Sequence, residues 1–244
     1  MSRLRAALAL IRPREIAVSV RRCPFCGPTI IVRLRSDEIG IRCVRCGASA
    51  VHMSVGWALK QMSVDLRSVD VCELSARGPV VNYLSAHARS LATSEYFSDV
   101  APGDVRDGIR CEDVQRLTYA DASFDLVTHT EVFEHVPDDA RAFLELHRVL
   151  KAGGIMVFTV PLTDRERTVE RARMIDGVVE NLLPPSFHTD PLRGGEQILV
   201  YRDYGADIVD RVKRAGFDDV NLLPPSSEIP WRMGRRVIVA RRLR

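Results

Sequence analysis

The sequence predicts an α/β protein with a mostly parallel sheet and helices on both faces, preceded by a small β module. Two observations support this prediction. From about Val69 onward, short apolar runs alternate with helical patterns, which is the order of repeated β-α-β units. Before that point, four cysteines form two Cys-x-x-Cys pairs separated by sixteen residues, a spacing typical of a zinc ribbon.

Composition is that of a globular protein with a charge asymmetry. The chain has 244 residues, and an apolar fraction of 46% is sufficient for a sizeable core. Residues 1–60 hold eleven Arg and Lys against three Asp and Glu, although the whole chain carries a net charge of only +3. We therefore expect a basic N-terminal domain over residues 1–60 and a second domain over residues 61–244.

The first fifteen residues, "MSRLRAALALIRPRE", place arginines ahead of a short apolar run but lack a small-residue cleavage pattern. We expect this segment to be retained. No apolar run approaches the roughly eighteen residues that cross a bilayer, so we expect no transmembrane segment and a cytoplasmic location.

The N-terminal cysteines are predicted to bind one structural zinc ion. The four ligands would be Cys23, Cys26, Cys43 and Cys46. Gly27 and Gly47 follow the two pairs at positions where tight turns need glycine, and the segment between the pairs reads as a hairpin. Four thiolates leave no open coordination position, so the ion would stabilise the module rather than activate water. Two disulfides are the alternative, but nothing in the sequence indicates secretion.

The arginines of this module leave several partners open: nucleic acid, anionic lipid at a peripheral membrane contact, or an acidic protein. Phe25 is the one aromatic residue among them, which argues against base stacking, so a docking or stabilising role is preferred. Cys72 and Cys111 fall in predicted strands and are expected to be buried, inert thiols.

The most specific part of the second domain is "CEDVQRLTYADASFDLVTHTEVFEHVPDDARAFLELHRVLKAGGIMVFTVPL", which includes "FDLV", "EHVPD" and "RVLKAGG". It resembles the class I S-adenosylmethionine-dependent methyltransferases of the small-molecule type 11 group, and the resemblance extends from about Asp65 to the C-terminus. The resemblance implies a Rossmann-like, seven-stranded sheet and S-adenosylmethionine as cofactor.

The loop after the first predicted strand departs from this family. Where the family reads acid-x-Gly-x-Gly-x-Gly, this chain has Ser75, Arg77 and Pro79 at the glycine places, with Gly78 displaced by one. Ser75 and Ala76 are small enough for the backbone to approach a ligand, Gly78 can adopt the turn conformation, and Pro79 suits a first helical position. Arg77 could pair with the methionine carboxylate or intrude on the pocket.

The resemblance assigns the remaining cofactor contacts to the ends of the strands. Glu73 would receive the methionine ammonium, and Glu95, twenty-two residues later, would take the ribose hydroxyls. Asp113 would accept from the adenine amino group, the backbone amide of Val114 would contact the ring, and Thr130 would border the cofactor at the end of its strand.

Methyl transfer from a sulfonium requires alignment of the acceptor and removal of one proton. His188 and His135 are the candidate bases, because an imidazole titrates near neutral pH, and Glu131 and Asp190 are alternatives. We rank His188 first because it lies in an insert, at about residues 163–200, of the kind that covers acceptors. In some quinone-ring relatives a divalent cation lies beside the acceptor, and here Glu131, Glu134 and His135 could hold one.

The insert also contains an Arg- and Glu-rich stretch at 165–173, expected to be a solvated helix, and it is followed by the polar run 201–204. An insert this polar, if it covers the acceptor, would suit a hydroxylated one. The chain lacks the Asn/Asp-Pro-Pro-Tyr motif of one base-modifying subgroup. We therefore expect O-methylation of a polar small molecule, sugar or glycan intermediate rather than of nucleic acid. The alternative is a cofactor-binding regulatory or RNA-associated protein with weak or no catalysis.

Overall fold

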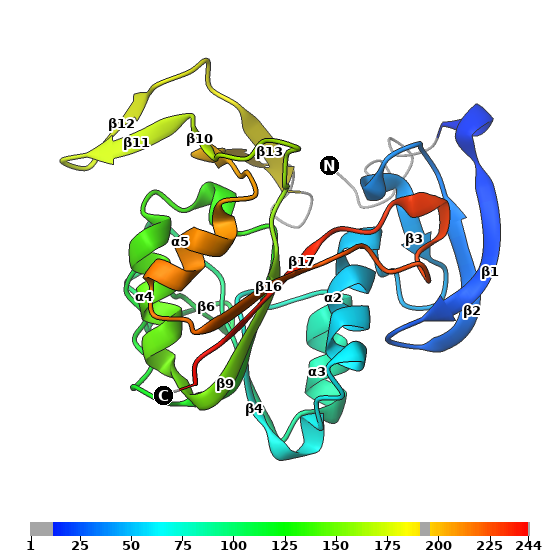
Figure 1. Cartoon of the computed structure of the whole chain (residues 1–244), viewed down its shortest axis with the longest axis horizontal. Helices are drawn as coiled ribbons and strands as arrows, with labels where there is room; N and C mark the ends of the chain where they lie inside the picture. Colours follow the sequence, from blue (N-terminus) through cyan, green and yellow to red (C-terminus); the bar gives the residue numbers. More distant parts are fainter. Residues whose placement is uncertain (1–11, 191–195, 244) are drawn as a thin grey trace.

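The structure, a computed structural model, describes residues 12–190 and 196–243, apart from the side chains of Ile39 and Asp190. It contains a small antiparallel sheet near the N-terminus, a central sheet with helices on both faces, and an arm of short hairpins (Figure 1). In the described part of the chain, no helix combines the length and apolarity needed to cross a membrane.

The N-terminal module, called the ribbon below, is a three-stranded antiparallel sheet of β1 (Ala17–Cys23), β2 (Gly27–Arg33) and β3 (Ile41–Cys43). A 3-10 turn, η2 (Glu38–Gly40), joins β2 to β3, and Asp37 caps it by accepting from the amide of Gly40. The expected hairpin between the cysteine pairs is therefore confirmed. Strand β1, which pairs along the whole of β2, was not anticipated.

The central sheet has the strand order β16-β17-β9-β8-β4-β5. Its strands are β4 (Asp70–Glu73), β5 (Ser90–Thr93), β8 (Phe124–Thr130), β9 (Leu150–Thr159), β16 (Asp219–Leu223) and β17 (Val237–Arg241). The four strands β9, β8, β4 and β5 run parallel, whereas β17 runs antiparallel to both of its neighbours, β9 and β16. The predicted mostly parallel sheet is confirmed, as are the two C-terminal strands.

The described sheet has six strands where the resemblance implied seven. The expected edge strand near residue 111 is reduced to one parallel bridge between Glu95 and Cys111. The preceding residues instead pair with each other as β6 (Val105–Arg106) and β7 (Ile109–Arg110). Because the backbone N–H and C=O groups of residues 105–110 bond within this hairpin, few of them are left to pair with the central sheet.

Helices cover both faces of the sheet, as predicted. On one face lie α2 (Ala50–Gln61) and α3 (Pro79–His87), and on the other α4 (Asp139–Val149) and α5 (Ile208–Arg214) (Figure 1). Successive strand residues point to opposite faces, so that Leu126 packs with α2 and α3 while its neighbour Val127 packs with α4 and α5. Cys72 and Cys111 are fully buried, as expected.

Helix α2, which was not anticipated, joins the ribbon to the sheet. Ser49 caps it by accepting from the amide of His52. Met53 on its first turns packs in the core of the ribbon, whereas Val55 and Leu59 pack against the central sheet. The ribbon and the central sheet are therefore tied together by one continuous helix.

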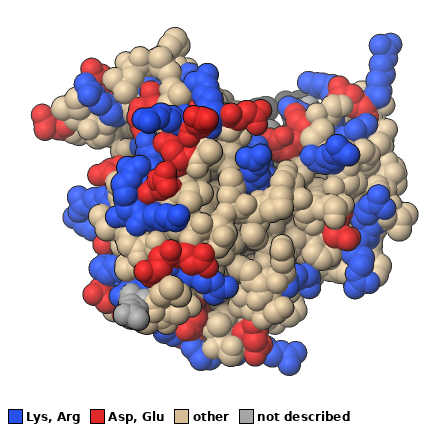
Figure 2. All heavy atoms as spheres, viewed as in Figure 1, with Lys and Arg blue, Asp and Glu red and all other residues tan. Residues whose placement is uncertain are grey.

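The insert forms the arm, and the helix expected at 165–173 is wrong. The arm contains β10 (Val169–Glu170), β11 (Ala172–Ile175), β12 (Val178–Asn181), β13 (Phe187–Asp190), β14 (Glu196–Leu199) and β15 (Arg202–Asp203). Its charges are paired between elements rather than along a helix: Arg171 binds Asp203, and Arg173 binds Glu180. Figure 2 shows charges of both signs crowded over the arm and α5, next to a largely uncharged centre.

Candidate active site

The parallel strands β4, β8 and β9 end at one edge of the sheet, where ligands bind in open α/β folds. The glycine-poor loop lies here, after β4. Gly78 has φ +115° and Pro79 begins α3, as predicted. Ser75 Oγ donates to the carbonyl of Arg77 at 2.9 Å, and the amide of Ala76 donates to the carboxylate of Glu95 at 3.1 Å. Side-chain bonds thus hold the turn that glycines form in the family.

The structure gathers the predicted cofactor residues along this edge. Glu73 is only 1% exposed and accepts from the hydroxyl of Thr128, and burial raises the pKa of Glu73 to about 8. Asp113 accepts from the amide and the side chain of Gln115, at 2.9 and 3.0 Å. Val114 is 9% exposed.

For two of the predicted cofactor residues, Arg77 and Thr130, the structure gives only the exposure of their side chains. The side chain of Arg77 is exposed. Thr130 is half-buried at the last position of β8. Their roles as cofactor contacts stay predictions.

The two predicted bases, 53 residues apart, lie side by side. His188 Nδ1 is 3.2 Å from His135 Nε2, and the rings are nearly perpendicular at 85°. His135 Nδ1 is 2.8 Å from the carbonyl oxygen of Leu199. Because a carbonyl only accepts, we assign the proton of neutral His135 to Nδ1, and its Nε2 then accepts from His188 Nδ1–H. This arrangement leaves His188 Nε2 with a free lone pair.

A buried carboxylate accompanies the histidine pair. Glu134 Oε1 lies 3.7 Å from His135 Nε2 and 3.6 Å from His188 Nδ1, and the Glu134 side chain is 1% exposed. The contact with Glu134 raises the pKa of His188. The ligand atoms of these three residues lie within 4.8 Å of one another, close enough for a divalent cation to bridge them.

Glu131 lies outside that group and turns toward an arginine. It is the first residue after β8 and has φ +53°, and its amide donates to the carbonyl of Thr159 at 3.0 Å. Its Oε2 lies 3.3 Å from Nη2 of Arg235. Burial and the charge of Glu134 raise the pKa of Glu131 to about 7, against the opposing effect of Arg235. The side chain of Asp190, the fourth predicted acid-base residue, lies outside the described part of the structure.

The arm holds the loop that carries these groups. Arg202 is 3% exposed and donates to the carbonyls of Phe133, Val136 and Pro137 at 3.1, 2.6 and 2.7 Å. The hydroxyl of Tyr204, also buried, donates to Asp139 at 2.9 Å. The run 201–204, expected to face an acceptor, therefore stabilises the loop instead.

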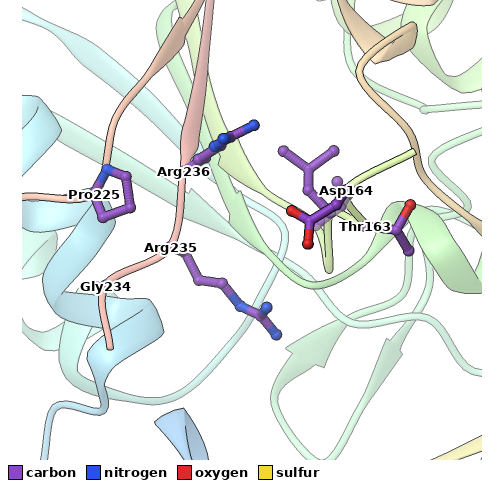
Figure 3. Close-up of a pocket in the computed structure, with 8 residues that line it drawn as sticks. Thr163, Asp164, Pro225, Gly234, Arg235 and Arg236 are labelled. Carbon is purple, nitrogen blue, oxygen red and sulfur yellow. The ribbon is translucent and has the colours of Figure 1, made fainter. Parts of the chain in front are cut away.

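A cavity of about 180 Å³ lies between the end of β9 and the start of β17, next to Arg235, the partner of Glu131. It is lined by Val160, Leu162, Thr163, Asp164, Pro225, Gly234, Arg235 and Arg236. Figure 3 shows Thr163 and Asp164 on one side of it, facing Arg235 and Arg236 on the other. Arg235, which the sequence did not single out, borders the cavity and also contacts Glu131.

The four ribbon cysteines converge, as their spacing predicts. The Sγ atoms of Cys23 and Cys46 are 3.6 Å apart, and those of Cys26 and Cys43 are 3.5 Å apart. All four Sγ atoms lie within 4.8 Å of one another. A tetrahedral site with metal–sulfur bonds of about 2.3 Å has sulfur–sulfur edges of about 3.8 Å, so this cluster fits a zinc ion. All four thiols are free, which disagrees with the disulfide alternative.

Comparison with known proteins finds similarity to methyltransferases in the central region of the chain. Residues 71–158 match the family model of a methyltransferase domain. A stretch of 104 residues is 34% identical to 2-methyl-6-phytyl-1,4-hydroquinone methyltransferase from Synechocystis sp., covering 35% of this chain and 33% of that protein. A stretch of 108 residues is 26% identical to ubiquinone biosynthesis O-methyltransferase from Coxiella burnetii, covering 41% and 46%. The match thus spans between a third and a half of these curated relatives.

Among solved structures, the glycopeptide N-methyltransferase MtfA in complex with sinefungin has a TM-score of 0.50 at 17% identity, covering 86% of this chain and 95% of that one. At this identity, the similarity shows that the two proteins share a fold. Residues 71–158 thus match a methyltransferase domain, and the chain shares the Rossmann-like fold of this solved methyltransferase.

Proposed function

We propose that this protein transfers a methyl group from S-adenosylmethionine to a hydroxyl oxygen of a polar small molecule, sugar or glycan intermediate. The observation that carries the proposal is the contact between His135, in the turn that follows β8, and His188 of β13 in the arm. An aliphatic hydroxyl stays protonated at neutral pH, so its oxygen needs a base as it attacks the methyl carbon. The carbon–sulfur bond breaks, S-adenosylhomocysteine leaves, and the proton passes to Nε2 of His188.

The other groups have supporting roles in this proposal. His135 is fixed by the carbonyl of Leu199 and orients His188, and Glu134 stabilises the imidazolium that forms. The cavity beside Arg235 is the proposed acceptor site. It lies at the same edge of the sheet as the acid-base candidates, and its lining residue Arg235 contacts one of them, Glu131.

The choice of acceptor is tested with radiolabelled S-adenosylmethionine and two panels. Because the named relatives act on a hydroquinone and in ubiquinone biosynthesis, the first panel contains dihydroxybenzenes. The second contains nucleotide sugars and free glycosides. We expect a product with the new methyl group on oxygen, located by mass spectrometry. A methyl group on nitrogen or carbon would refute the reaction class.

The pH dependence of turnover follows from the base. Because Glu134 raises the pKa of His188 above its ordinary 6.5, the free-base form needed for catalysis appears only as pH rises through that raised value. We expect kcat/KM to rise through this range. Glu134→Gln lowers the pKa of His188 and should move the acidic limb to lower pH. An acidic limb that stays in place in Glu134→Gln would assign the titration to another group.

Cofactor binding is predicted to depend on Glu95. Removing its two charge-assisted bonds to the ribose, at about 1.5–3 kcal/mol each, should weaken affinity for S-adenosylmethionine at least about 10-fold in Glu95→Ala. Calorimetry measures this directly, and Glu228→Ala, which removes an exposed carboxylate elsewhere, is the control. Equal affinities of the two variants would contradict the assignment.

We also propose that the ribbon binds one zinc ion through its four cysteines and that the chain acts in a reducing, cytoplasmic setting. The tetrahedral spacing of the four Sγ atoms supports the zinc site, and thiolate ligands require a reducing compartment. Phe25 adds no support to the RNA-associated alternative, because its ring packs 5.2 Å from that of Tyr83.

A further inference from the structure

The large apolar side chains that are exposed among the described residues gather mainly on two surfaces. One belongs to the ribbon, and the other to the hairpin of β11 and β12 in the arm. Single exposed apolar residues are ordinary in soluble proteins, but a contiguous group of them marks an interface. Figure 1 shows the hairpin and the ribbon at opposite ends of the molecule, so the two surfaces of one chain do not cover each other.

The ribbon sheet has an apolar side chain layer on each of its two faces. Ile31 of β2 is fully buried on the inner face, in the ribbon core with Ile229, and Trp231 packs against that core. Alternate residues point the other way, so Val20 and Ile30, which are paired across β1 and β2, lie on the outer face and are 74% and 42% exposed. The outer face of such a sheet is usually polar. The surface called the outer ribbon face below consists of Ile16, Val18, Val20, Ile30 and Val44.

The hairpin is also apolar on both of its faces. Met174 is paired with Val179 on one face, and Ile175 is paired with Val178 on the other. These four side chains, called the hairpin surface below, are between 38% and 68% exposed. A two-stranded hairpin is only marginally stable in water by itself. Uncovered apolar pairs on both faces therefore indicate that a partner covers this hairpin.

The two surfaces carry opposite charge. Strand β1 contributes Arg21 and Arg22, both exposed, and neither β1 nor β2 contains an acidic residue. In the hairpin, Nε of Arg173 is 2.6 Å from Oε2 of Glu180, and this ion pair leaves Asp176 at the turn as the net negative charge. A basic apolar surface and an acidic apolar surface are complementary, whereas pairing either surface with itself would bring like charges together.

We propose that two copies of this chain form a dimer in which the hairpin surface of each copy packs on the outer ribbon face of the other. Each copy offers both surfaces, so an exchange of hairpins about a two-fold axis makes two equivalent contacts and leaves neither surface open. Two contacts also double the buried area, which favours an interface of the standard size, about 1,600 Å² in total. A membrane fits the hairpin less well, because Asp176 at its turn would be the first residue to enter the bilayer.

The test measures the mass of the full chain in solution by sedimentation velocity, without any acceptor, so it can fail or succeed independently of the proposed function. We expect a concentration-dependent dimer with twice the chain mass of 27.3 kDa. Val178→Glu in the hairpin and Val20→Glu in the ribbon each place an unpaired carboxylate in both contacts, and each should weaken the dimer at least about 100-fold. Leu144→Glu is the control, because Leu144 is 54% exposed on α4, outside both surfaces.

An equimolar mixture of Val178→Glu and Val20→Glu distinguishes this dimer from others. The mixed pair has one unaltered contact, made by the hairpin of the Val20→Glu copy and the ribbon of the Val178→Glu copy. Because one substitution already breaks a contact, placing both in the other contact costs little more. We therefore expect the mixture to dimerise at concentrations where neither variant does alone, which also shows that both variants are folded.

Four results would overturn the proposal. A dimer that only one of the two substitutions breaks would mean that the substituted surface pairs with itself. A dimer that survives both substitutions would lie elsewhere on the molecule. A mixture that stays monomeric would contradict the exchange of hairpins. A protein that is monomeric at all concentrations would have another partner on these surfaces, and flotation with vesicles of anionic lipid would identify that partner as a membrane.

Discussion

Replacing His188 by alanine is expected to lower turnover at least about 100-fold while leaving affinity for S-adenosylmethionine nearly unchanged, because a positioned base contributes roughly 10²–10⁴-fold. His135→Ala should cost less, since His188 keeps its free Nε2 and loses only the partner that orients it. Steady-state kinetics with an acceptor found in the panels, together with calorimetry for the cofactor, separates chemistry from binding.

His87→Ala is the matched control for this experiment. His87 is exposed at the end of α3 and bonds only to the carbonyl of Tyr83 among the described contacts, so its loss should leave turnover unchanged. Near-normal turnover in both His188→Ala and His135→Ala would exclude the histidine pair. The proton would then pass to Glu131 or Asp190, or a cation bound at Glu134 would lower the pKa of the acceptor.

Cys43→Ser is expected to abolish zinc binding and to unfold the ribbon, because the binding free energy of a closed thiolate site, about 10–16 kcal/mol in zinc-finger peptides, is folding free energy. Elemental analysis should give one zinc per chain for the unaltered protein and none for the variant. Hydrogen exchange should show lost protection over residues 12–60 and also over residues 229–235, which pack on the ribbon.

Cys72→Ala serves as the control for metal content, because Cys72 is buried in the central sheet away from the four-thiolate cluster. It should retain its zinc whatever its effect on stability. A fully folded Cys43→Ser protein without metal would show that the ribbon needs no ion.

The features predicted from sequence are those determined by local patterns. Cysteine spacing places Cys23, Cys26, Cys43 and Cys46 together because each pair is formed by its own turn. The apolar runs give the parallel strands, and the Gly78-Pro79 pair gives the start of α3, because each depends on the preference of a few neighbouring residues.

The features missed depend on contacts between distant residues. Glu38 and Arg235 are 197 residues apart, and neither lies in a motif that could indicate their contact. In the stretch 165–173, Arg and Glu spacing favours a helix, but Glu170 and Arg171 find stronger partners in Arg211 and Asp203. The missing seventh strand is a different case, because the β6–β7 hairpin satisfies those backbone groups locally.

The participation of Ile229 and Trp231 in the ribbon core has a consequence for the order of events during protein synthesis. The cysteine pairs leave the ribosome early, but the residues that close their core emerge roughly 180 residues later, at about 5–20 residues per second. The nascent ribbon therefore spends about ten seconds or more with an incomplete core. During that interval the proposed zinc ion would be its main source of order, so we expect zinc shortage to increase degradation of the nascent chain.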